Sequence, residues 1–171
     1  SDVCSSDLAL YSNTTGTSNI GIGIGALYAN TTGITNTAIG TKALAANTTA
    51  NGNTALGYYA LSASTGASNT GLGRYALGAN TTGIENTSVG RDTLITNTTG
   101  SYNTALGTYA LQFNTTASDN TAVGYQSAYS NNSATLAISN NALLTGNVYR
   151  VVIRVTGANT VYSSNATLTV A

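Results

Sequence analysis

The sequence predicts an all-β fold, a parallel β-solenoid built from short strands. Two observations carry this prediction. One sequence unit recurs at a fixed spacing over residues 9–130, and within that unit small and β-branched residues alternate with a period of two. A unit of 17 residues is too short for a pair of helices. We therefore expect each copy to form one coil and the coils to stack.

Columns of residues that keep the same phase mark the repeating unit. Ala-Leu pairs begin at residues 9, 26, 43, 60, 76 and 110, with Thr93-Leu94 in the one gap, so the steps are 17, 17, 17, 16, 17 and 17 residues. A glycine follows the Asn of each unit four residues later. The single short copy, residues 53–68, loses its residue where Ser64-Thr65-Gly66 replaces Asn-Thr-Thr-Gly. A turn is where a solenoid tolerates a deletion.

Each unit is expected to hold two short strands and two turns. In Thr37-Ala38-Ile39 the Thr and the Ile share one face, and the Ala shares the other face with Gly40. The Ala-Leu segment is predicted to form the second strand, and Asn-Thr-Thr-Gly to form a turn. Coils about 4.8 Å apart would give a rod on the order of 34 Å long.

Stacking turns every sequence column into a row of neighbouring side chains. Two aliphatic columns are the predicted core: Ile22, Ile39, Leu56, Leu72, Val89, Leu106 and Val123, and Leu27, Leu44, Leu61, Leu77, Leu94 and Leu111. The Asn column is predicted to form an amide ladder: Asn19, Asn36, Asn53, Asn69, Asn86, Asn103 and Asn120. The Ala and Gly columns form a flat face of small residues, through which we expect chains to associate.

Charged residues are scarce, which excludes several classes of function. The 171-residue chain has five Lys or Arg, five Asp or Glu and no His, so its net charge is zero and nucleic acid is not an expected partner. The acids of the repeat, Glu85, Asp92 and Asp119, stand singly, so we expect no enzyme, catalytic residue, metal site or cofactor. Cys4 is the only cysteine, and no apolar run is long enough for membrane insertion.

The motif Asn36-Thr37-Ala38-Ile39-Gly40 and its six echoes resemble the head repeats of YadA-like trimeric autotransporter adhesins. The resemblance covers residues 9–130. It implies a left-handed β-roll, a homotrimer, and an extracellular location on the bacterial cell surface. The unit here is longer than the usual unit of that family, and its Ala-Leu-x-x-Asn-Thr-Thr-Gly half is not typical.

The function implied by this resemblance is that of a structural and adhesive segment. Repeated weak contacts along a rod would give multivalent binding to host or environmental surfaces, with a glycan or a protein as ligand. One alternative is a receptor-binding segment of a phage tail fibre. A self-cleaving chaperone domain downstream of the repeat would indicate this alternative. A second alternative is an ice-binding solenoid that uses the regularly spaced Thr columns of the Asn-Thr-Thr turns.

Two segments of different character flank the repeat. Within residues 1–8, Asp2-Val3-Cys4-Ser5-Ser6-Asp7-Leu8 resembles a translated sequencing adapter, so we expect an artefact or a disordered lead-in. Across residues 131–171 the period stops, and three alternating segments resemble the last strands of a bacterial immunoglobulin-like domain, with Tyr149 at its tyrosine corner. We expect these strands to form an antiparallel β segment, which is either a partial immunoglobulin-like domain or a cap on the last coil.

Two sets of turn residues are open to both a binding and a structural interpretation. Tyrosines follow the motif glycine in several coils and either pack over the turn or bind a glycan or protein: Tyr58, Tyr59, Tyr75, Tyr109 and Tyr125. Sequons in the turns either accept N-glycans or simply supply the turn, and the turn interpretation is favoured: Asn30, Asn47, Asn80, Asn97 and Asn114.

Overall fold

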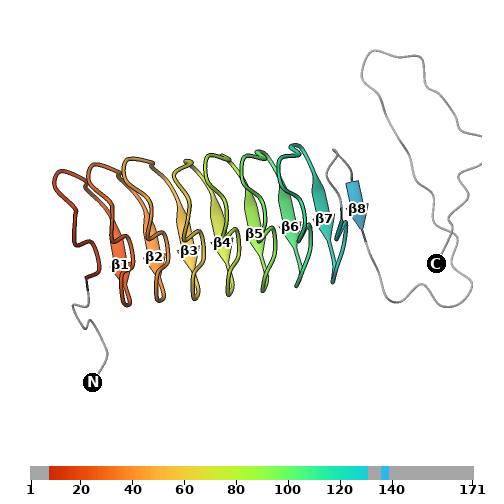
Figure 1. The fold of residues 1–171 in the computed structure, drawn as a ribbon, viewed down its shortest axis with the longest axis horizontal. Helices are drawn as coiled ribbons and strands as arrows, with labels where there is room; N and C mark the ends of the chain where they lie inside the picture. Colours follow the sequence, from red (N-terminus) through yellow and green to blue (C-terminus); the bar gives the residue numbers. More distant parts are fainter. Residues whose placement is uncertain (1–7, 131–135, 139–171) are drawn as a thin grey trace, which may run out of the picture. The chain divides into compact units, whose positions relative to one another are not determined.

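The computed structural model describes residues 8–130 and the backbone of residues 136–138. Over these residues the chain is a parallel β-solenoid that contains no helix, which confirms the predicted fold class. Figure 1 shows its short strands following one another along one axis, with the rest of each coil looping away from the strand and back to the next.

Every described strand is three residues long, and the strands of consecutive coils pair with each other. They are β1 (Ile20–Ile22), β2 (Thr37–Ile39), β3 (Thr54–Leu56), β4 (Thr70–Leu72), β5 (Thr87–Val89), β6 (Thr104–Leu106), β7 (Thr121–Val123) and β8 (Leu136–Ile138). All pairs are parallel and follow chain order. The register places like residues together, as where Thr37 lies opposite Thr54 and Ala38 opposite Ala55.

The strand that follows the seventh motif extends the same sheet. β8 pairs in parallel with β7, with Leu136 opposite Thr121. The sequence predicts an antiparallel segment here, and for this strand that prediction is wrong, because its backbone adds one more rung to the ladder. Tyr149 and the other two immunoglobulin-like segments lie outside the described residues, as do Cys4 and the rest of residues 1–7.

The predicted second strand at the Ala-Leu segment does not form in the described coils. The leucine there adopts a left-handed backbone conformation, with φ of 50° at Leu44, and the following Asn47 N–H closes a turn on the Leu44 carbonyl at 3.2 Å. The segment still stacks, because the Leu44 N–H donates to the Ala60 carbonyl of the next coil at 3.0 Å. Ala43 and Leu44 are both fully buried, whereas in an extended segment two successive side chains would lie on opposite faces.

The first predicted core column is wrong, because the strands present these side chains outward. Ile22 is 44% exposed and Leu56 and Leu106 are each 47% exposed, while the remaining four are half-buried: Ile39, Leu72, Val89 and Val123. The middle residue of each strand points inward instead, and Ala38, Ala55 and Ala105 are fully buried. The interior of a coil this narrow accepts a methyl group at that position and has no room for a branched side chain.

The second predicted column forms the core of the solenoid. Its six leucines are fully buried, as the sequence predicts: Leu27, Leu44, Leu61, Leu77, Leu94 and Leu111. The inward alanines of the strands and those that precede the leucines pack around them. Because the small-residue face is the inside of the coil, it cannot serve as the surface through which chains associate.

The motif glycine lies where neighbouring coils come closest. Gly40 has φ of +127°, a conformation that other residues rarely adopt, and a Cβ there would lie 2.6 Å from the carbonyl oxygen of Gly57 in the next coil. Backbone conformation and close approach therefore both require glycine at the end of each strand.

Candidate functional site

The predicted Asn ladder joins each coil to the next through its side-chain oxygens. Asn36, Asn53 and Asn103 are fully buried. In each case the main-chain N–H donates to the side-chain Oδ1 of the Asn one coil earlier, at 2.9 Å from Asn36 to Asn19 and 3.0 Å from Asn103 to Asn86. Most of the side-chain Nδ2 groups donate to a turn carbonyl, as from Asn36 to Ala50 at 2.9 Å. The predicted amide-to-amide bonds form at three steps, where Nδ2 of Asn86, Asn103 and Asn120 also donates to Oδ1 of the Asn one coil earlier. The ladder therefore consists mainly of side-chain to backbone bonds.

A second Asn ladder runs through the Asn-Thr-Thr turns, where the sequence predicts only a turn. Asn47 donates from Nδ2 to Oδ1 of Asn30 at 2.8 Å, and Asn97 does the same to Asn80 at 2.9 Å. The five sequon asparagines are fully buried: Asn30, Asn47, Asn80, Asn97 and Asn114. An N-glycan cannot be carried on an amide that is enclosed in the coil, so the turn interpretation holds. The signal for this ladder was present as a column that is Asn in every copy except one.

The short coil interrupts the second ladder. Ser64 takes the place of the Asn, and Asn80 Nδ2 donates to its hydroxyl at 3.1 Å. The buried Oδ1 of Asn47 and the buried Nδ2 of Asn53 then have no hydrogen-bond partner among the described residues. The strand register is unaffected, with Thr54 opposite Thr70, so the deletion falls in the turn, where the sequence places it.

The outer face of the strands carries two parallel columns, one mostly Thr and one aliphatic. Thr104 and Leu106 of β6 both point outward, and the same holds for Thr54 and Leu56 of β3. The columns are about 7 Å apart, since alternate residues of a strand lie on the same face. We call this surface, formed by the first and third residues of β1 to β7, the outer strand face.

The turn after the strands carries the second surface feature, a row of tyrosines and cations. The rings of Tyr58 and Tyr75, from consecutive coils, are 5.5 Å apart, and those of Tyr109 and Tyr125 are 6.0 Å apart. Burial against neighbouring groups and interaction with Tyr58 raise the pKa of Tyr75 above its ordinary value. We call this row the cation–tyrosine edge, made of Lys42, Tyr58, Tyr59, Arg74, Tyr75, Arg91, Asp92, Tyr109 and Tyr125.

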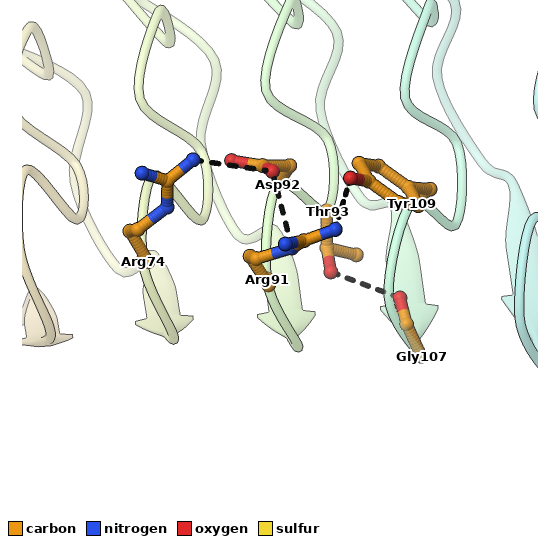
Figure 2. Close-up of polar contacts among 6 residues, drawn as sticks. All are labelled: Arg74, Arg91, Asp92, Thr93, Gly107 and Tyr109. Carbon is orange, nitrogen blue, oxygen red and sulfur yellow. Dashed lines mark hydrogen bonds and ion pairs between the residues drawn. The ribbon is translucent and has the colours of Figure 1, made fainter.

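Asp92 replaces a tyrosine in the middle of this edge and draws two arginines together (Figure 2). Its Oδ2 lies 3.8 Å from Nη2 of Arg74 and 3.4 Å from Nε of Arg91, and the residue is only 7% exposed. The Arg91 guanidinium lies over the ring of Tyr109, 4.7 Å from its centroid, and Nη2 donates to the Tyr109 hydroxyl oxygen. One buried carboxylate and one ring thus fix two cations.

Within the described part of the chain no three His, Cys, Asp or Glu side chains gather into a group that could hold a metal ion. The same residues include no helix long and apolar enough to cross a bilayer.

Comparisons with known protein families, with curated proteins and with solved structures found no match to this chain.

Proposed function

We propose that the chain is a structural and adhesive repeat segment of an extracellular bacterial surface fibre. The observation that carries the proposal is the outer strand face, where every coil from β1 to β7 presents an aliphatic residue and, in β2 to β7, a Thr, all in the same register. A solitary rod would leave Ile22, Leu56 and Leu106 close to half exposed along its length. Regular apolar columns of this kind mark an interaction surface.

The partner proposed for the outer strand face is a second and third copy of the same chain. Two rods that each repeat about every 4.8 Å match each other coil by coil, so one good contact is reproduced along the whole length. Three copies about a common axis would cover the aliphatic columns and leave the cation–tyrosine edge available. The expected assembly is a homotrimer, as the resemblance implies, although it forms through the strand face and not through the small residues.

Sedimentation of the full chain tests this association. The expected mass is three times that of the 17.1 kDa chain. Leu56→Asp with Leu106→Asp places charges on the outer strand face, and we expect this variant to sediment as a folded single chain, because an unpaired charge at a buried interface costs several kcal/mol.

The control for that variant changes an aliphatic residue away from the strands. Ile34 is 39% exposed and lies in a turn, so Ile34→Asp should leave the mass unchanged. A folded wild-type chain with a single-chain mass at micromolar concentration would refute side-by-side association.

A second candidate is the ice-binding solenoid, and one observation favours it. The Thr column of the outer strand face, from Thr37 to Thr121, is a regular hydroxyl array of the kind that an ordered water layer requires. The Thr column of the turns is a poorer array, because hydroxyls such as that of Thr81 donate to a carbonyl of the next coil, at 2.9 Å to Thr98. Thermal hysteresis by a single-chain species would support this function, and its absence would remove it.

A further inference from the structure

The charges of the described repeat are sorted between the two ends of the strands. Lys42, Arg74 and Arg91, the three cations within residues 8–130, all follow a strand and lie on the cation–tyrosine edge. Glu85 and Asp119 lie in the turn that precedes a strand. Asp92 is the one acid on the edge, so the edge keeps a net charge of +2 although the whole chain is neutral.

The two arginines are held in place while much of each guanidinium faces solvent. The Arg74 and Arg91 side chains are 55% and 50% exposed, whereas the Asp92 side chain between them is 10% exposed. A guanidinium has five N–H donors, and the contacts of Arg74 with Asp92 use only Nη2. Two pre-organised forks on consecutive coils are therefore presented to an anion, and Asp92 contacts both of them from a position between them (Figure 2).

Tyrosine rings flank this arginine pair on both sides. Arg74 lies over the ring of Tyr75, 4.9 Å from its centroid, and Tyr75 joins Tyr58 and Tyr59 in one cluster with centroids 4.5 to 5.5 Å apart. Tyr109 lies beside Arg91. Aromatic rings with a polar tip pack against the C–H faces of sugars while their hydroxyls bond to the sugar hydroxyls.

We propose that the cation–tyrosine edge binds an acidic polysaccharide along the axis of the stack. Arg74 and Arg91 pair with its anionic groups, and the rings of Tyr58, Tyr75 and Tyr109 pack against its sugars. The inference deepens the proposed function and rests on it, because it names the ligand class for an extracellular adhesive rod.

The spacing of the charges favours such a polymer over a nucleic acid strand. From Lys42 to Arg91 the edge spans three coil steps, or about 14 Å, and carries a net charge of +2. A nucleic acid strand has one phosphate per about 3.4 Å and would place about four charges over that length. In an acidic polysaccharide the charged groups are carried on sugar rings that have apolar C–H faces, which fits cations interleaved with tyrosines.

The test measures binding of the full chain to immobilised polygalacturonate and to heparin, which separate carboxylate from sulfate recognition. Dextran is the neutral polymer, and single-stranded oligothymidylate is the nucleic acid. We expect binding to at least one acidic polysaccharide that weakens as salt is raised, and no binding to dextran. Arg74→Gln with Arg91→Gln should weaken that binding about tenfold, since each exposed charge pair contributes modestly. Tyr58→Ala with Tyr109→Ala should also weaken it.

A charge-matched control separates the edge from the overall charge of the chain. Arg150→Gln with Arg154→Gln removes the same two charges outside the described residues and should leave binding unchanged. Equal loss in this control, stronger binding to oligothymidylate, or no binding to either acidic polysaccharide would overturn the inference. Circular dichroism of each variant verifies that the coils are intact.

The molecular mass measured by sedimentation distinguishes failure of this inference from failure of the proposed assembly. A trimer that binds neither acidic polysaccharide overturns the ligand and leaves the fibre segment standing. A single-chain species whose polysaccharide binding depends on Arg74 and Arg91 overturns the assembly and leaves the ligand site standing.

Discussion

The two faces of the same three-residue strands differ sharply in burial. Inside, Ala105 is fully buried, whereas outside, its neighbour Leu106 is 47% exposed. The larger apolar side chain thus lies on the less buried side. The comparison teaches that in a very narrow solenoid the volume of the interior, and not hydrophobicity alone, decides which face of a strand is turned inward.

The interior is filled by three kinds of residue that each reach it in a different way. Alanine methyls come from the strands, and leucines such as Leu94 come from left-handed turns. Asparagines come from two places, directly before the strand, as Asn86 does, and the Asn-Thr-Thr turn. The asparagines satisfy backbone groups that no strand ladder reaches, as where the Asn103 N–H donates to Asn86 at 3.0 Å. A coil with one three-residue strand therefore depends on side-chain amides for much of its cohesion.

The largest contrast between the faces should come from truncating a leucine of the core. Leu94→Ala should lower the free energy of unfolding by about 2 to 5 kcal/mol, because it opens a cavity between coils. Val89→Ala, on the outer strand face of the same coil, should cost well under half as much in the single chain. Urea unfolding followed by circular dichroism measures both free energies, with each substitution made in the single-chain variant that carries Leu56→Asp and Leu106→Asp. Equal losses would mean that the two faces are not distinct.

The next effect concerns the polar interior. Asn86→Ala removes the Oδ1 that accepts from the N–H and from Nδ2 of Asn103, 3.0 Å from each, and Nδ2 keeps only its bond to the Ala117 carbonyl. Loss of these bonds in a buried place should cost about 2 to 4 kcal/mol. Asn51→Ala removes an acceptor of the same type from an exposed turn, where Ile34 N–H donates to it at 2.8 Å, and should cost about 1 kcal/mol or less. Thermal unfolding ranks the two, and an equal cost would contradict the structural role of the ladder.

A moderate effect is expected when the inner face is enlarged. Ala105→Val adds two methyl groups to the closed interior and should destabilise the chain by about 1 to 3 kcal/mol. Leu106→Val, the adjacent residue on the outer strand face, should change the stability of the single chain by about 0.5 kcal/mol or less. A neutral Ala105→Val variant would show that the interior has spare room, against the volume argument.

The smallest expected effect is a gain in stability at the short coil. Replacing Ser64-Thr65-Gly66 by Asn-Thr-Thr-Gly should give Asn47 Oδ1 the partner that it lacks and raise the free energy of unfolding by about 1 kcal/mol. Inserting one Thr after Thr82 in a regular coil serves as the control and should be destabilising. A repaired coil that melts at a lower temperature would show that the 16-residue turn is already the better fit.

The periodic features of the fold were predictable from the sequence, and the facing of its side chains was not. The fixed spacing predicted the stack, the buried Leu column beginning at Leu27, the Asn column and the deletion at Ser64. Alternation over three residues cannot tell which face is inward, so Ile22 and its equivalents were assigned to the wrong side. The Ala-Leu segment was predicted as a strand because its left-handed leucine leaves no trace in local propensity.

The candidate site was predictable only in part. The sequence places tyrosines on the turn after the motif glycine, but it does not show that Arg74, Arg91 and Asp92 meet there, since Asp92 occupies the position next to the one that the two arginines share. Their meeting depends on how far side chains reach between coils. The second Asn ladder was hidden for a similar reason, because Asn-Thr-Thr is also a common turn sequence.

The bonds that join coil to coil run along the axis of the stack, since parallel strands pair only with their neighbours in chain order. Tension applied to the two ends of the chain would therefore load one coil at a time. Each release would free 17 residues, or about 55 Å of extended chain. Such a segment would lengthen under load in small, nearly equal increments, with one slightly shorter step from residues 53–68. Each step would dissipate part of the mechanical energy applied between two anchored ends.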